Sequence, residues 1–156
     1  MSTMRVLTVR QPWASLIVLG HKNIENRTWS TRYRGPLLIH AASAPSVNAR
    51  EARALAASLG VGLPASLPLG RIVGVVNLDE CVSHSPSPWF DGPVGWQLSG
   101  ARVLDCGRRI CGRLGLWSVE LNAAEWEIVH PSAGVRGAES GQCSGIEVET
   151  ALLHPA

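Results

Sequence analysis

Lysine is almost missing from this chain of 156 residues. Thirteen of its fourteen basic residues are arginines, and the one lysine is Lys22. Arginine is the better fork for carboxylates and phosphates and stays charged, whereas the lysine amine is a compact donor that can lose its proton when it is buried or near other cations. The sequence therefore indicates that position 22 needs a property that arginine lacks. The alternative interpretation is that an arginine-rich composition leaves a single lysine by chance and that this lysine has no special role.

Long apolar runs are also missing. No run reaches the roughly 18 residues of a membrane span, the first six residues lack the apolar core of a signal peptide, and the apolar stretch 13–19 is too short and too far from the start to supply one. With 46% apolar and 17% charged residues, the composition is that of an ordinary globular protein. We therefore expect one domain with a full core, no membrane contact and a cytoplasmic location.

The four cysteines form no metal motif. Cys81, Cys106, Cys111 and Cys143 include no C-x-x-C pair and have no histidine at ligand spacing. The C-x-x-x-x-C formed by Cys106 and Cys111 is a weak signal for zinc or a disulfide. Reduced thiols in a cytoplasmic protein are the better interpretation, so we expect no metal and no cofactor.

Positive charge is concentrated near the start of the chain. Residues 1–34 carry six basic residues and one acidic residue, a net charge of +5, whereas residues 35–156 carry eight basic and eleven acidic residues, a net charge of −3. This asymmetry predicts an anion site for nucleic acid or a nucleotide phosphate. Trp13, Trp29 and Tyr33 lie among these cations, and flat rings suit stacking on bases. The alternative is a protein-interaction domain whose basic segment is only a solvated face, with Trp13 packed inward.

The hydrophobic pattern predicts many short elements. Strands are expected at 5–9, 37–41, 71–78, 94–98, 102–104 and 114–119, an extended segment at 24–29, and helices at 13–19 and 46–59. Because no regular βαβ alternation is present, we predict a mostly β, α+β fold with a small twisted or closed sheet and flanking helices. After residue 122 the pattern weakens. The segment 134–145 reads as flexible, and Trp126, Ile128, Val129, Ile146 and Val148 are candidates for docking on the sheet.

Several motifs occur in a recognisable order. They are L-T-V-R-Q-P-W-A from Leu7, G-H-K-N-I-E-N-R from Gly20, Y-R-G-P-L-L-I-H-A from Tyr33, and the later pair G-R-I-V-G from Gly70 and G-R-L-G-L-W from Gly112. In this respect the chain resembles the ASCH domain family. The resemblance implies a PUA-like small β-barrel over residues 1–120, with residues 121–156 as an extension that is partly flexible or docked on the barrel. It also implies a cleft lined by the G-x-K-x-x-E-x-R segment and a role in RNA or nucleotide metabolism, because related domains bind RNA and some members cleave RNA or hydrolyse acetylated cytidine.

Lys22 and Glu25 are the central pair of that segment. They would share a face in a helical turn and point apart in a strand. If they meet, either Glu25 holds Lys22 charged as a clamp on a phosphate or carbonyl oxygen, or Glu25 acts as a base while Lys22 stabilises an oxyanion. A surface ion pair is the remaining alternative.

Further residues complete two hypotheses. For binding of RNA or a nucleotide, the candidates are Gln11, Trp13, Lys22, Arg27, Trp29, Arg34 and His40, although a histidine at the end of an apolar strand is more often a core residue. For hydrolysis of an acetylated nucleoside amide or an RNA phosphodiester, the candidates are Lys22, Glu25 and Glu80, which follows the strongest predicted strand and could face Lys22. The hydrolase branch of the family has a nucleophilic threonine where this chain has Glu25, so binding is the preferred interpretation.

Overall fold

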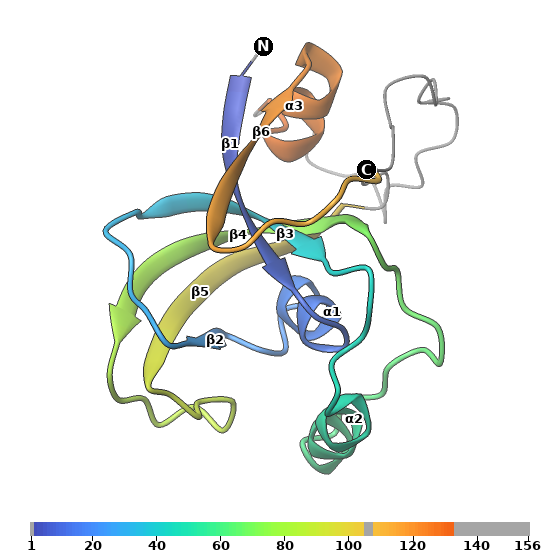
Figure 1. Cartoon of the computed structure of the whole chain (residues 1–156), viewed down its shortest axis with the longest axis vertical. Coiled ribbons are helices and arrows are strands. Elements are labelled where there is room, and N and C mark those ends of the chain that lie inside the picture. Colours follow the sequence, from blue (N-terminus) through green and yellow to red (C-terminus); the bar gives the residue numbers. More distant parts are fainter. Residues whose placement is uncertain (1, 105–107, 133–156) are drawn as a thin grey trace.

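The computed structural model describes residues 2–104 and 108–132. Six strands form one curled sheet, a half-barrel, in the order β2-β5-β4-β3-β1-β6 (Figure 1). Neighbouring strands are antiparallel except β1 and β3, which are parallel. The strands are β1 (Ser2–Val9), β2 (Ile24–Arg27), β3 (Gly35–Ala41), β4 (Arg71–Val82), β5 (Val94–Val103) and β6 (Leu116–Leu121). The mostly β, α+β fold predicted from the sequence is confirmed.

Four strands are longer than the hydrophobic pattern indicated, namely β1, β3, β4 and β5, and pairing explains the last two. β4 continues to Val82, beyond the predicted end at residue 78. β5 is a single strand over the two short segments predicted at 94–98 and 102–104. The reason is pairing: β4 and β5 remain partnered from Gly74–Val103 to Val82–Gly95, with two register shifts. Backbone hydrogen bonds with the neighbouring strand thus extend both elements through residues that carry no apolar signal.

The helix α1 (Trp13–Val18) closes the open side of the curled sheet (Figure 1). Its buried face joins the inner side chains of β1, β3, β4 and β5 in one apolar core. The contact with β4 is very close, because a Cβ atom on Gly74 would lie 2.4 Å from Val18 Cγ1 and 2.7 Å from the carbonyl oxygen of Arg102. Glycine at position 74 is what allows the helix to approach the sheet.

A second core covers the other face of the sheet. There the helix α3 (Ala123–Val129) packs against β1 and β6 side chains, and Val129 is buried while Trp126 and Ile128 contact the same cluster. The predicted docking of these three residues is confirmed. Arg102 of β5 holds the end of α3 by donating to the carbonyl oxygens of Ile128, at 2.8 Å, and of Val129.

The remaining helix, α2 (Ala49–Ser58), buries mainly Ala52 and Ala56. Among the described residues no helix has the length and apolarity to cross a membrane.

Some sequence-based expectations concern residues outside the described ones. These are the flexible segment 134–145, the docking of Ile146 and Val148, and the thiols of Cys106 and Cys143.

Candidate functional site

The segment between α1 and β2 places the lysine. Gly20, with a φ of +83°, ends the helix turn, and the amides of His21 and Lys22 both donate to the carbonyl oxygen of Leu16. The chain then enters β2, which pairs with the start of β5. Because Lys22 lies in the turn before the strand, strand alternation does not separate its side chain from that of Glu25.

Lys22 and Glu25 form a buried ion pair. The Nζ atom of Lys22 lies 2.8 Å from Oε1 of Glu25, and the two side chains are 2% and 9% exposed. The same amine donates to the carbonyl oxygen of Ile24 and lies 5.5 Å from the centre of the Trp13 ring. The alternative of a surface ion pair is therefore excluded, and the two residues meet as the cleft hypotheses require.

Arg27 extends this pair into a row of alternating charges. Its guanidinium donates to Oε2 of Glu25 at 3.0 Å and to the carbonyl oxygen of Thr8 at 2.9 Å. The amide of Asn26 donates to Oε1 of Glu25 at 3.2 Å. Burial alone would raise the pKa of the Glu25 carboxyl, but the charges of Lys22 and Arg27 and their hydrogen bonds outweigh burial and lower the pKa below its ordinary value. Glu25 is therefore an anion held between two cations.

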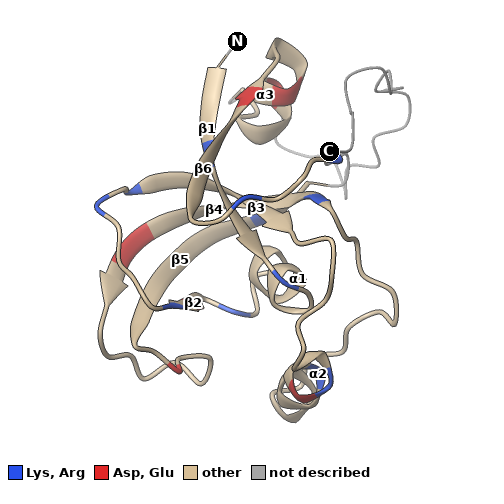
Figure 2. Cartoon of the chain, viewed as in Figure 1, with Lys and Arg blue, Asp and Glu red and all other residues tan. Residues whose placement is uncertain are grey.

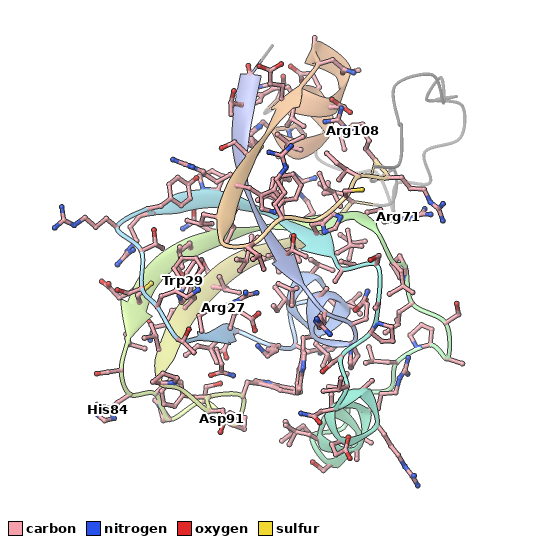
Figure 3. All side chains as sticks on the ribbon, in the orientation of Figure 1. Arg27, Trp29, Arg71, His84, Asp91 and Arg108 are labelled. Carbon is pink, nitrogen blue, oxygen red and sulfur yellow. The ribbon has the colours of Figure 1, made fainter. Side chains whose placement is uncertain are left out.

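This charge row lines a pocket of about 640 Å³. The lining carries four basic residues, Arg10, Lys22, Arg27 and Arg113, and two acidic residues, Glu25 and Asp91. Arg10 and Arg113 are exposed, and neither has an acidic partner within the described part of the chain. The other lining residues are Thr8, Val9, Trp13, Asn26, Ala42, Ser43, Ser46, Asn48, Gly112, Leu114 and Gly115. Figure 3 shows Arg27 and Asp91 as they project from β2 and from the loop before β5.

Asn26 fixes one wall of the pocket. Its Nδ2 donates to the carbonyl oxygen of Trp89 at 2.9 Å, and its Oδ1 accepts from the amides of Asp91 and Gly92 at 2.8 and 3.0 Å. These three bonds tie the loop before β5 to β2 and bring Asp91 to the pocket. Neither Asn26 nor Asp91 was predicted as a site residue, because the contact joins positions that are about 65 apart.

A chain of hydrogen bonds supports the opposite wall. Nε1 of Trp117 donates to Oγ1 of Thr8 at 3.0 Å, the Thr8 hydroxyl lies 3.3 Å from Nδ1 of His40, and Nε2 of His40 lies 2.6 Å from the carbonyl oxygen of Ile110. A carbonyl accepts only, so Nε2 carries the proton, and Nδ1 is left to accept from Thr8. Burial lowers the pKa of the His40 imidazole, although the Ile110 carbonyl opposes this. His40 is a fully buried neutral residue that fastens the segment 110–115 to β1 and β3.

The predicted site residues fall into two groups. Trp13, Lys22, Glu25 and Arg27 line the pocket. The others lie elsewhere: Gln11 binds Ser15 and the carbonyl oxygen of Pro68, Trp29 packs edge-on against Trp96 with ring centres 4.8 Å apart, and His40 is buried behind Thr8.

The expected position of Glu80 beside Lys22 is wrong. Glu80 is exposed and accepts from Arg34 at 2.7 Å, and this hydrogen bond, with a further one from the Cys81 amide and the charge of Arg34, lowers the pKa of the Glu80 carboxyl. Arg34 also donates to the carbonyl oxygens of Thr31 and Tyr33, so it does not reach the pocket either. The reason is that β4 continues past Glu80, which therefore sits within a strand rather than at the pocket edge.

Residues able to hold a metal do not gather in the described ranges, since no three His, Cys, Asp or Glu side chains lie together there. The pocket lining combines arginines, an aromatic ring and small polar side chains, a chemistry that suits an anionic ligand. Its only described carboxylates are Glu25, which is neutralised by its neighbours, and Asp91.

Comparison with known proteins agrees with this architecture. The chain is 41% identical to human activating signal cointegrator 1 over 84 residues and 39% identical to the mouse protein of the same name over a stretch of equal length. In each case the match covers 50% of this chain but only 14% of the relative, so this chain corresponds to a small part of those proteins. Residues 7–132, which include every pocket-lining residue and α3, match the ASCH domain. The chain therefore belongs to the ASCH domain family.

Proposed function

We propose that the pocket binds a single-stranded RNA segment or a modified nucleotide. The supporting observation is that two exposed arginines, Arg10 and Arg113, line it without an acidic partner among the described residues. They share the lining with the charge row of Lys22, Glu25 and Arg27, which has an excess of one positive charge. Phosphate oxygens are the natural acceptors for such guanidinium groups, which bind them through two parallel hydrogen bonds.

The pocket also offers a surface for a base. The half-buried ring of Trp13 lines it, and the edge-on contact of Trp13 with Trp89, at 6.4 Å between ring centres, fixes the ring's orientation. Stacking of a base on such a ring contributes about 1–3 kcal/mol. Ser43, Ser46 and Asn48 line the same pocket and supply donors and acceptors for a base edge or a ribose.

Lys22 has a role in this proposal that arginine could not fill. An ammonium group has three donors, and two of them are used by Ile24 and Glu25. The third is free to bind a ligand oxygen in the pocket. A planar guanidinium needs more room than this buried amine has, at 2% side-chain exposure.

A hydrolase acting on an acetylated nucleoside or an RNA phosphodiester is the second candidate, and the contact between Lys22 and Glu25 favours it. Two observations favour binding instead. Glu25 has a lowered pKa and accepts three hydrogen bonds, which makes it a weak general base. Glu80, the third member of the expected catalytic set, is bound to Arg34.

A cytoplasmic location is also part of the proposal, because the sequence spacing of the four cysteines favours reduced thiols.

The binding proposal is tested with labelled single-stranded RNA by fluorescence anisotropy. Arg10→Ala and Arg113→Ala are each expected to weaken binding about five- to tenfold, because each removes one phosphate contact. Arg32→Ala is the matched control, since Arg32 is also exposed but does not line the pocket. Binding should fall steeply with salt, and equal effects of all three variants or a flat salt response would contradict the proposal.

The hydrolase candidate is tested by incubating the protein with acetylated and plain nucleosides and short RNAs, followed by mass spectrometry. The binding proposal expects retained ligand without conversion. Conversion that is lost in Lys22→Arg while ligand binding persists would replace it with the catalytic one.

A further inference from the structure

We propose that the RNA strand continues out of the pocket over Arg71 and Arg109, so that the ligand is an oligonucleotide rather than a single nucleotide. This inference rests on the proposed function and specifies its ligand. Neither arginine lines the pocket. Both lie close to its wall, at the end of the sheet where β4 begins and where Figure 2 shows basic residues in blue.

The sheet topology brings Arg71 to this end of the sheet. β1 and β3 are parallel and end side by side, with Val9 opposite Ala41, and β4 begins there with Arg71 opposite Ala41. The residue after β1 is Arg10, and the residues after β3, Ala42 and Ser43, line the pocket. Arg71 therefore starts its strand one residue pair away from the pocket wall.

Backbone bonds bring Arg109 to the same place. Arg71 and Arg109 form a β-bridge, flanked by hydrogen bonds from Ile110 to the carbonyl oxygen of Gly70 at 3.1 Å and from Ile72 to that of Arg108 at 3.2 Å. The segment then runs on through Gly112 to Arg113, both of which line the pocket. Four residues span at most about 14 Å, so Arg109 and Arg113 present their charges on one short, anchored segment.

The two arginines differ from the other basic residues nearby. Arg102 donates to the carbonyl oxygens at the end of α3. Nε of Arg108 lies 3.5 Å from Oε1 of Glu125. In residues 2–104 and 108–132, no acidic side chain pairs with Arg71 or Arg109. Arg109 is exposed, and Nε of the half-buried Arg71 has no hydrogen-bond partner there. Figure 3 shows Arg71 at the same side of the molecule as Arg108, where β4 begins.

A row of cations that leads away from a pocket with an aromatic ring fits a nucleic-acid strand. Grooves that track single strands combine a basic path along the backbone with rings for the bases. An acidic peptide would use the same charges, but its carboxylates do not stack on the Trp13 ring as a base does. RNA is therefore the ligand that accounts for both features, and the peptide becomes an outcome of the test.

The experiment compares two lengths of labelled oligocytidylate, three and nine nucleotides, by fluorescence anisotropy with the full chain. In the double variant Arg71→Gln/Arg109→Gln, the dissociation constant of the nonanucleotide should rise about tenfold or more. The slope of its salt dependence should fall by roughly 1.4, for two lost phosphate contacts. The trinucleotide, which is expected to occupy the pocket alone, should change its dissociation constant by less than about twofold. The control is Arg32→Gln/Arg50→Gln, which alters two exposed arginines that do not line the pocket.

The single variant Arg109→Gln guards against misfolding, because an exposed side chain can be replaced without disturbing the core. This variant should weaken binding of the nonanucleotide alone, by about threefold. An equal loss of affinity for both oligonucleotides, or no loss of affinity for the nonanucleotide, would contradict the proposed path over Arg71 and Arg109. Displacement of the nonanucleotide by nonaglutamate as effectively as by unlabelled RNA would overturn the assignment to nucleic acid. Failure of the proposed function itself has a different signature, namely trinucleotide binding that is absent or insensitive to Arg10→Ala and Arg113→Ala.

Discussion

At the scale of single residues, Glu25 joins three parts of the pocket. It accepts from Lys22 in the turn after α1, from Arg27 further along β2, and from the amide of Asn26, whose side chain holds the loop before β5. Two cations are thus packed around one buried carboxylate. Removing that carboxylate leaves like charges together in a poorly solvated place, which is much costlier than breaking an exposed pair.

Glu25→Gln is therefore expected to lower the free energy of unfolding by about 3 kcal/mol or more, the usual result when one partner of a buried pair is removed. The measurement is urea denaturation at neutral pH. Glu80→Gln is the matched control, because it breaks the exposed pair with Arg34, and its midpoint should stay close to that of the wild type. Similar midpoints for both variants would show that burial does not strengthen the Glu25 pair.

Stability should also depend on pH through His40. Its pKa is lowered from the ordinary 6.5, so as the pH falls below 6.5 the unfolded chain takes up the proton before the folded protein does. The free energy of unfolding should therefore fall from pH 6.5 downward until the lowered pKa is passed. Glu25 adds to this below pH 4.5, because its pKa is also lowered, and its contribution is complete only above that value.

His40→Gln isolates the histidine's part. An amide can donate to the Ile110 carbonyl and accept from Thr8 without titrating. Urea midpoints measured at pH 7.5, 6.5 and 5.5 should fall less in this variant than in the wild type. Parallel pH profiles would mean that the folded protein protonates His40 as readily as the unfolded chain does.

Four of the seventeen residues that line the pocket were predictable from residue types. The unusual lysine, its spacing from Glu25 and the charge asymmetry indicated four residues that do line the pocket. Arg113 and Asp91 carried no signal, because they reach the pocket through contacts between distant segments. The predicted position of Glu80 was wrong for a related reason. The apolar pattern of β4 stops at residue 78, but pairing with β5 extends the strand to Val82.

At the scale of elements, Gly112 shows how closely the segment 110–115 lies on the sheet. A Cβ atom at this position would lie 2.9 Å from Cγ2 of Thr8 and 3.0 Å from Cε1 of His40. Both neighbours are held by the hydrogen bonds to Trp117 and Ile110, so they cannot easily move away. The segment must then shift instead, and with it the pocket wall that carries Arg113.

Gly112→Ala is thus expected to weaken RNA binding and to cost about 1–3 kcal/mol of stability, the range for overpacking a tight site. Gly62→Ala is the matched control, because a Cβ atom at that position meets nothing within 4 Å. Fluorescence anisotropy and thermal denaturation check the two effects. Wild-type behaviour of Gly112→Ala would mean that the segment is not held against Thr8.

Most elements were predictable from the periodicity of the sequence, because β1, β3, α1 and α2 have apolar patterns bounded by glycine or proline. α3 was not expected as a helix, since only seven residues form it and its signal is local. Asn122 and Glu125 make a capping box, in which the Asn122 side chain accepts from the Glu125 amide at 2.8 Å and the Glu125 side chain accepts from the Asn122 amide at 2.9 Å.

At the scale of the whole molecule, the extent of the folded unit can be tested. The resemblance suggested a domain over residues 1–120, and we propose that α3 is needed to complete it, because Val129 is buried in the second core and Arg102 binds the end of the helix. A chain that ends at Leu121 should unfold at a clearly lower temperature than one that ends at Ser132, as measured by circular dichroism. Equal midpoints would place the boundary before α3.

The position of β1 between β3 and β6 has a consequence for synthesis on the ribosome. The first strand can pair with β3 early, but its other edge stays open until residues 116–121 emerge, since Ser2 lies opposite Leu121. Trp117, the donor that orients Thr8, arrives in that same late stretch. Until residues 116–121 have been synthesised, a nascent chain therefore carries an unprotected strand edge, and Thr8 lacks the donor that orients it.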